Sequence, residues 1–238
     1  MRNVILYLLL LFNVLPLFAQ KPKAADEMLK INQFYLKNRK ITMNAEFRFF
    51  RNAYDKTPFL AEKANIATYE NLSNYSTTSK EIINGKDYYL YVNHTGKEIL
   101  IAGQQTSTPQ FSPEAYLSTF NELLKSCRTY KTGDDGKDSR YCFLFFDSKH
   151  IQEFRIWYTA SYAIKKMVLI GESLPGNGFA GDESKITKIE IIYSNINTSP
   201  KFTKNLFDYS RYLSHYKGNF VATKSYEKYA VRSLYIKK

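Results

Sequence analysis

The chain has 238 residues, of which 44% are hydrophobic, and it carries a formal net charge of +12. A chain of this length buries a core large enough to be stable without many disulfides, so a small disulfide-dependent scaffold is excluded. The basic excess would suit nucleic acid or an anionic membrane. However, the lysines are spread along the chain, with no cluster beyond pairs such as Lys165-Lys166 and Lys237-Lys238, which is typical of a solvated surface.

Residues 1–19 have the pattern of a secretory signal peptide. Arg2 supplies the positive start, residues 4–15 are apolar, and the small residue Ala19 precedes the expected cut. A transmembrane anchor is the competing interpretation, but the apolar run is shorter than the roughly 18 to 20 residues that a span needs. No cysteine follows the cut to carry a lipid anchor. We therefore expect a periplasmic or secreted protein with a single domain over residues 20–238 and no membrane anchor after cleavage.

The first half of the mature chain predicts one helix followed by a strand meander. Helical spacing of apolar residues covers 24–38, and strict alternation from Ile41 to Phe49 is typical of a half-buried strand. Residues 65–83 read as one or two strands. Asn84-Gly85 predicts a type I′ hairpin turn, which requires positive φ at both positions. Strands at 86–93 and 97–102 then enclose a turn at 94–96.

In the hairpin strand, Tyr88, Leu90 and Val92 fall on one side, and Tyr89 and Tyr91 fall on the other. We expect the first set to face the core and the second set to keep its hydroxyls in water.

The second half begins with a predicted helix after Ser112, which caps it, and continues mainly as strands. The expected strands cover 127–132, 140–147, 152–159, 162–170 and 185–194, with a Gly-rich insertion at 171–184. Residues 204–216 fit a short helix or a strand, and the end of the chain fits a strand. Because the elements do not alternate as βαβ units, the fold class is α+β, a large antiparallel sheet with two or three segregated helices.

The two cysteines, Cys127 and Cys142, flank a Gly/Asp turn that could bring their segments side by side. In an oxidising compartment this favours a disulfide, which would close a loop of about 15 residues and contribute roughly 3 kcal/mol. The alternative is two buried free thiols.

No constellation of residues indicates catalysis, a metal or a cofactor. A G-x-S-x-G elbow is absent, and His94, His150 and His215 are not spaced as metal ligands. The acidic run 134–138 lacks the alternating carboxylates and distant Glu of a calcium loop. The glycines of "LPGNGFAG" do not form a phosphate-binding fingerprint. We therefore expect a non-enzymatic protein without cofactor.

The order of elements resembles the periplasmic lipoprotein-carrier family, the LolA-like proteins. The residues that carry the resemblance are "ADEMLKINQFYLKNRKITMNAEFRF", a helix running into a long strand, and "NGKDYYLYVNHTGKEILI", the following hairpin. The resemblance implies an unclosed half-barrel with helices on its concave side and a hydrophobic cavity that shelters acyl chains. It places Met43, Phe47, Phe49, Leu90 and Val92 on the cavity wall. The alternative for each is ordinary core beneath a helix.

Two functions remain open on this basis. The first is an exported protein that binds a lipid, a lipoprotein acyl chain or another apolar ligand. The second is an interaction or scaffold module of a bacterial envelope complex, with Tyr-rich outer faces as the contact surface and an envelope protein as partner. The export signal makes nucleic acid an improbable target.

Overall fold

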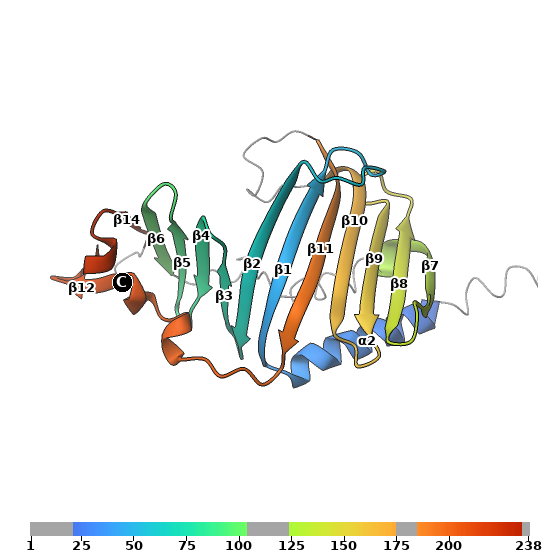
Figure 1. The fold of residues 1–238 in the computed structure, drawn as a ribbon, viewed down its shortest axis with the longest axis horizontal. Coiled ribbons are helices and arrows are strands. Elements are labelled where there is room, and N and C mark those ends of the chain that lie inside the picture. Colours follow the sequence, from blue (N-terminus) through green and yellow to red (C-terminus); the bar gives the residue numbers. More distant parts are fainter. Residues whose placement is uncertain (1–20, 104–123, 175–184, 235–238) are drawn as a thin grey trace, which may run out of the picture. The chain divides into compact units, whose positions relative to one another are not determined.

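The protein is described from a computed structural model, over residues 21–103, 124–174 and 185–234 (Figure 1). The predicted signal peptide and residues 112–123 of the predicted second helix lie outside this part of the chain. The elements in chain order are α2 (Lys21–Lys37), β1 (Lys40–Phe50), β2 (Leu60–Tyr69), β3 (Leu72–Ser76), β4 (Lys80–Asn84), β5 (Tyr88–Asn93), β6 (Glu98–Gly103), β7 (Cys127–Asp134), β8 (Ser139–Phe146), β9 (Glu153–Thr159), β10 (Ile164–Leu174), β11 (Ile186–Asn197), η1 (Lys204–Phe207), η2 (Tyr209–Arg211), β12 (Leu213–Tyr216), β13 (Asn219–Ala222), η3 (Lys224–Tyr226) and β14 (Ala230–Ser233).

Within the described residues, 12 strands form one open sheet in the order β14-β6-β5-β4-β3-β2-β1-β11-β10-β9-β8-β7, and β12 and β13 form a separate hairpin. The predicted large antiparallel sheet with few helices is confirmed. One pair departs from it, because β14 runs parallel to β6. No described helix is long and apolar enough to cross a membrane.

The described residues divide into two compact units. Unit 1 is drawn from Met1–Lys37, Phe47–Ala61 and Leu117–Ile192, and unit 2 from Asn38–Glu46, Glu62–Tyr116 and Tyr193–Lys238. Strands β1, β2 and β11 contribute residues to both. This division into two units does not test the expectation of a single domain over residues 20–238, which stays a prediction.

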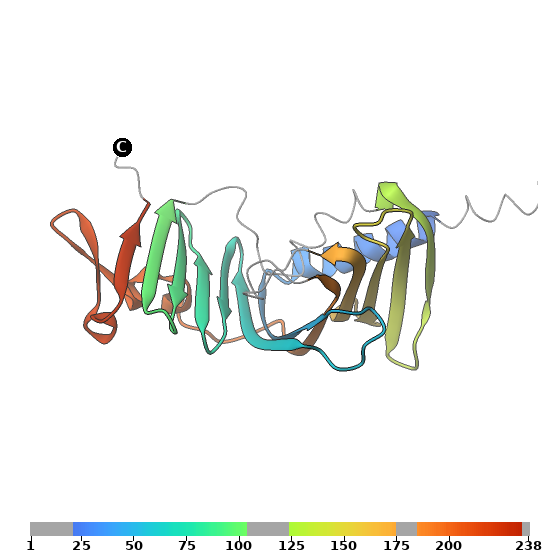
Figure 2. The ribbon, with the colours of Figure 1, turned by 90° about the horizontal axis from the view of Figure 1, so that it is seen from above.

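Unit 1 is an antiparallel meander of β7 to β11 with α2 against one face (Figure 2). The predicted helical stripe is confirmed, since Met28, Ile31 and Tyr35 are buried. The Tyr35 hydroxyl accepts a hydrogen bond of 3.0 Å from the backbone N–H of Ile164, where β10 begins. The helix is therefore fixed to the sheet by apolar burial and by a polar contact at its C-terminal end.

Unit 2 is a second meander, from β2 to β6, whose one face is covered by the C-terminal part of the chain. Leu90 and Val92 of β5 are fully buried in a cluster with Tyr212 and Leu213. On the opposite face, Tyr89 and Tyr91 are half-buried, and burial raises the pKa of both phenols. Strand β5 is therefore apolar on both faces because neither face is fully open to water.

Residues 60–84 form three strands, where one or two were expected, and the turn after β4 is not of type I′. Neither Asn84 nor Gly85 is among the described residues with positive φ. Asn84 pairs with Tyr89, and the N–H of Gly85 donates to the carbonyl of Tyr88 over 2.9 Å. A Cβ on Gly85 would overlap the Tyr88 ring. Glycine is required here by the close approach of a ring and not by its φ.

The expected disulfide is not formed in the structure, where Cys127 and Cys142 are buried free thiols. The reason is the register of β7 and β8, in which Cys127 lies opposite Phe146 and Cys142 lies opposite Thr132. That offset of four residues corresponds to about 13 Å along the strands, and a disulfide needs Cα atoms within about 7 Å.

Candidate ligand pocket

Unit 2 contains a pocket of about 450 Å³. It lies among residues of β1 to β4, the end of β11 and the segment of η1 and η2. The volume is within the range of about 300 to 1,000 Å³ that is typical of small-molecule sites. Its apolar lining residues are Met43, Ile66, Ala67 and Leu206, and its polar ones are Thr42, Asn44, Asn65, Asn74, Ser76, Glu81, Asn195, Asn197 and Arg211.

A buried carboxylate, Glu81 of β4, organises one side of this pocket. It is 4% exposed and accepts hydrogen bonds from Asn74 Nδ2 at 2.6 Å, from Arg211 at 2.9 Å and from the Tyr212 hydroxyl. A carboxylate without such partners would cost several kcal/mol to bury. Burial, followed by the bond to Glu81, raises the pKa of Tyr212, so this phenol stays a donor.

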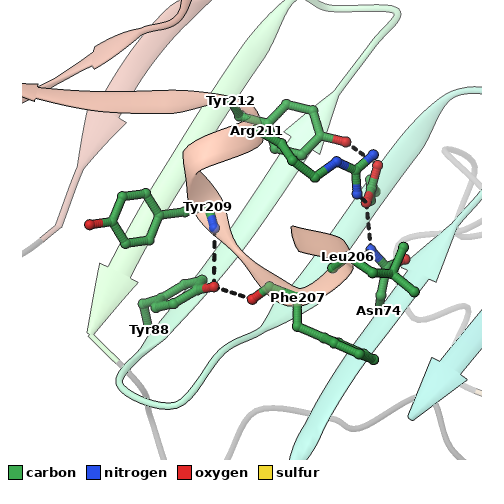
Figure 3. Close-up of polar contacts among 8 residues, drawn as sticks. Asn74, Tyr88, Leu206, Phe207, Tyr209, Arg211 and Tyr212 are labelled. Carbon is green, nitrogen blue, oxygen red and sulfur yellow. Dashed lines mark hydrogen bonds and ion pairs between the residues drawn. The ribbon is translucent and has the colours of Figure 1, made fainter. Parts of the chain in front are cut away.

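Three further hydrogen bonds fix the segment of η1 and η2 that borders the pocket. Asn74 Nδ2 also donates to the carbonyl of Leu206 over 2.9 Å. The Tyr88 hydroxyl donates to the carbonyl of Phe207 and accepts from the N–H of Tyr209 over 3.1 Å (Figure 3). The backbone polar groups of η1 and η2 are thus paired with side chains of β3 and β5. The wall that carries Leu206 is held in place before any ligand arrives.

Most of the other polar side chains of the lining form no hydrogen bond within the described part of the chain. Among the described residues, the side chains of Asn44, Asn65 and Asn195 have no hydrogen-bond partner, and Asn197 Oδ1 accepts from the N–H of Ser199 over 2.9 Å. Each amide offers both donors and acceptors. The charges of Glu81 and Arg211 compensate each other. The pocket therefore offers an apolar wall and neutral hydrogen-bonding groups.

The five predicted lining residues are not brought together. Met43 lines the pocket, whereas Leu90 and Val92 pack under Tyr212 and Leu213. Phe47 and Phe49 are each 2% exposed and belong to unit 1. A role in ligand binding stays a prediction for all five.

The residues that organise the pocket, Asn74, Glu81 and Arg211, were not predicted from the sequence. Glu81 follows Lys80 at the start of β4 and looks there like a solvated charge. In the structure it lies in the run 81–84, which is buried throughout. The signal that could have found it is a carboxylate and an amide, Glu81 and Asn84, on either side of the apolar pair Ile82-Ile83 in one short strand.

The histidines lie in packing contacts and in a loop. His94 Nδ1 lies 3.2 Å from the Tyr229 hydroxyl, and the ring of His215 lies 4.2 Å from that of Phe220. His150 lies in the loop between β8 and β9, where its N–H donates to the Ser148 hydroxyl. Within residues 21–103, 124–174 and 185–234, no group of three or more His, Cys, Asp or Glu is placed to hold a metal ion.

Unit 1 presents a second feature, a row of half-buried aromatic rings on the face formed by Tyr141, Phe143 and Trp157. The ring centroids of Tyr141 and Phe143 are 4.6 Å apart, and those of Phe143 and Trp157 are 4.8 Å apart. The Arg155 guanidinium lies 5.6 Å from the Phe143 centroid, and Lys166 Nζ lies 5.3 Å from that of Trp157. This aromatic row combines apolar area with cations.

Comparison with known proteins gives structural likenesses only. No family model matches the sequence, and no curated protein matches it. Among solved structures, a conserved protein of Thermus thermophilus is 8% identical, with 88% of this chain and 98% of that chain covered and a TM-score of 0.47. A LolA superfamily protein from Nitrosomonas europaea is 10% identical, with 79% and 98% covered and a TM-score of 0.36. LprF from Mycobacterium bovis is 10% identical, with 76% and 95% covered and a TM-score of 0.40. The distant likeness to LolA-like proteins is thus found among structures as well, and it says nothing of what this chain binds.

Proposed function

We propose that the chain is an exported, non-enzymatic protein of the cell envelope that binds a lipid, a lipoprotein acyl chain or another apolar ligand. The observation that carries the proposal is the pocket of about 450 Å³ in unit 2. The signal-peptide pattern of residues 1–19 supports export to the periplasm.

Binding of an apolar chain needs area and shape, not a reactive group. Leu206 is half-buried, and Ala67 lies on the same sheet face as Asn65, so these two residues give the pocket its apolar surface. Met43 and Ile66 border it as buried residues that are each 2% exposed. An acyl chain gains about 0.8 kcal/mol for each CH₂ that it buries. Micromolar binding corresponds to about 8 kcal/mol, so it takes roughly ten buried methylenes, or fewer together with polar contacts at the opening.

The polar groups of the pocket favour binding over catalysis. Glu81 is the one carboxylate in the described lining, and its oxygens accept hydrogen bonds from three side chains. A general base needs a free lone pair within reach of its substrate. Glu81 therefore acts as a structural acceptor that holds Arg211 and Tyr212.

The direct test is displacement of a fluorescent fatty acid from the purified mature chain. We expect saturable binding of the probe, and we expect Leu206→Asn to weaken it roughly tenfold, since this removes an apolar contact from the wall. Leu234→Asn is the matched control, because Leu234 is 62% exposed and lies outside the pocket. If the wild-type chain binds neither this probe nor an uncharged amphiphile, the proposal is wrong.

The aromatic row of unit 1 favours a second candidate, an interaction module that docks one envelope protein. Tyr and Trp are enriched at such interfaces because they bury area and keep a polar edge. Co-purification of one defined protein with the wild-type chain, and its loss in Trp157→Ala, would support this candidate. Tyr54→Ala is the control, since Tyr54 is 92% exposed and does not belong to the row.

A further inference from the structure

We infer that the unit 2 pocket binds a neutral, hydroxyl-rich group, that is, a sugar, either free or as the head group of an amphiphile. The inference rests on the proposed function and names the chemical class of its ligand. It follows from the charges, from the uncommitted amides and from their arrangement on the strands.

The charge balance of the pocket disfavours an anionic ligand. Glu81 and Arg211 are the charged residues of the described lining, and their side chains are 2.9 Å apart. A phosphate or carboxylate that approached Arg211 would also meet the Glu81 carboxylate. The negative ligand and the Glu81 carboxylate would then repel each other, and the repulsion is strong where water is excluded. A neutral polar group avoids this cost.

The uncommitted groups match hydroxyls. A sugar hydroxyl donates one hydrogen bond and accepts others, so it is best met by groups that do both. The amides of Asn44, Asn65 and Asn195 and the hydroxyl of Ser76 are such groups, and they have no partner among the described residues. A purely apolar ligand would leave these groups without compensation on binding.

The strand register places several of these groups in one row. Asn65 of β2 pairs with Ser76 of β3, and Ser76 pairs with Glu81 of β4, so the three side chains share one face at neighbouring positions. Cross-strand neighbours lie about 5 Å apart, so two of these side chains can contact different hydroxyls of one sugar ring. Asn74, next along the same face, is fixed by its bonds to Glu81 and Leu206. The row is therefore built on a sheet and has one end fixed by the hydrogen bonds of Asn74 and Glu81, as a selective site requires.

The apolar wall completes the match. The C–H face of a sugar, or the alkyl chain attached to it, finds apolar surface on Leu206 and on Ala67, which lies on the same sheet face as Asn65. A pocket that is apolar on one side and amide-rich on the other distinguishes a glycosylated amphiphile from a plain fatty acid. The discrimination comes from hydrogen bonds that only the first can make.

The experiment is isothermal titration of the mature chain with octyl glucoside below its critical micelle concentration, with glucose and with octanoate. We expect octyl glucoside to bind at least tenfold more tightly than octanoate. In the double variant Asn44→Ala/Asn65→Ala we expect its affinity to fall about 10- to 100-fold, since each lost pair of hydrogen bonds is worth roughly a factor of 3 to 10, while octanoate binding is unchanged. Asn219→Ala is the matched control, because Asn219 is an exposed amide of unit 2 outside the pocket.

The outcomes distinguish a failure of the sugar inference from a failure of the proposed function. Glucose binding as tightly as the glucoside would support a free sugar as ligand and would overturn the apolar ligand of the proposed function, whereas binding of the glucoside alone supports a glycosylated amphiphile. Octanoate binding as tightly as the glucoside, or a double variant with unchanged glucoside affinity, overturns the inference and leaves the proposed function standing. If none of the three probes nor the fluorescent fatty acid binds, both are overturned.

Discussion

The two units contain the same pairing, a buried carboxylate that accepts a tyrosine hydroxyl, and use it differently. In unit 1, Glu27 of α2 accepts from the Tyr158 hydroxyl of β9 at 2.7 Å and from Lys30 Nζ at 3.1 Å. In unit 2, Glu81 accepts from Tyr212, Arg211 and Asn74. The first pair fixes a helix to a sheet. The second fixes the C-terminal segment to a sheet and borders a pocket. The same chemistry is thus purely structural in one unit and supports a candidate binding site in the other.

The largest effect is expected from removing the carboxylate of unit 2. Glu81→Ala leaves Arg211 and the buried Tyr212 hydroxyl without their acceptor, and we expect a loss of about 3 to 5 kcal/mol in the free energy of unfolding in urea. The control Glu98→Ala breaks an ion pair with Arg232 whose side chains are 43% and 70% exposed, and should cost less than about 1 kcal/mol. Equal effects of the two substitutions would contradict the account of Glu81.

A smaller effect is expected in unit 1. Tyr158→Phe keeps the ring and removes the hydroxyl that donates to Glu27, and a hydrogen bond to a charged group contributes about 1.5 to 3 kcal/mol. Burial, followed by the bond to Glu27, raises the pKa of Tyr158, so the phenol is a donor at all physiological pH values. Urea unfolding measures the loss, with Tyr141→Phe as a control on a half-buried tyrosine of the same unit. A loss below that of the control would mean that the bond does not stabilise α2.

Glu27 is expected to make the free energy of unfolding depend on pH. Burial alone would raise the pKa of Glu27, but the hydrogen bonds from Tyr158 and Lys30 outweigh it and hold the pKa below 4.5. The folded state therefore favours the ionised form. Its stabilising contribution is present above the unfolded pKa and is lost as the pH falls through the lower folded pKa.

The measurement is the free energy of unfolding between neutral pH and the acid range, compared between the wild-type chain and Glu27→Gln. We expect the difference between the two to shrink as the pH falls below about 4.5. A difference that grows toward acid pH would mean that the folded pKa is raised.

The smallest effect concerns the reactivity of the thiols of Cys127 and Cys142, which form no hydrogen bond with Glu27 or Glu81. Burial raises the pKa of Cys142 to about 12, and the Cys127 thiol donates to the carbonyl of Thr129 over 2.9 Å. We expect neither thiol of the folded chain to react with an alkylating reagent at neutral pH, and both to react in urea without a reductant. Labelling that requires a reductant would show that the two cysteines form a disulfide after all.

The sequence predicted the strands of unit 1 closely, because each strand alternates between a buried and a half-buried face. The expected strands 140–147 and 152–159 correspond to β8 and β9 within one residue at each end. The turn at Asn84-Gly85 was predicted wrongly in type, because the N–H of Gly85 donates to the carbonyl of Tyr88, so the turn runs over residues 85–88 and neither Asn84 nor Gly85 has positive φ. One or two strands were expected over residues 65–83, where the structure has parts of three, β2, β3 and β4. Buried polar residues such as Asn74 and Glu81 interrupt the alternation of apolar residues there.

The pocket could not be predicted from the sequence for a different reason. Arg211 and Tyr212 lie 130 and 131 residues after Glu81, so no local pattern links them. The uncommitted amides look like ordinary surface residues until the strand register places Asn65 beside Ser76. A cavity depends on packing, which residue periodicity does not encode.

The most direct test of the central claim is native mass spectrometry of the full-length chain purified, without detergent exchange, from its own envelope. The account predicts a retained lipid or glycosylated amphiphile on the wild-type chain and on Leu234→Asn, with its loss on Leu206→Asn. A wild-type chain that carries no such ligand, together with no displacement of the fluorescent fatty acid, would contradict ligand binding in unit 2.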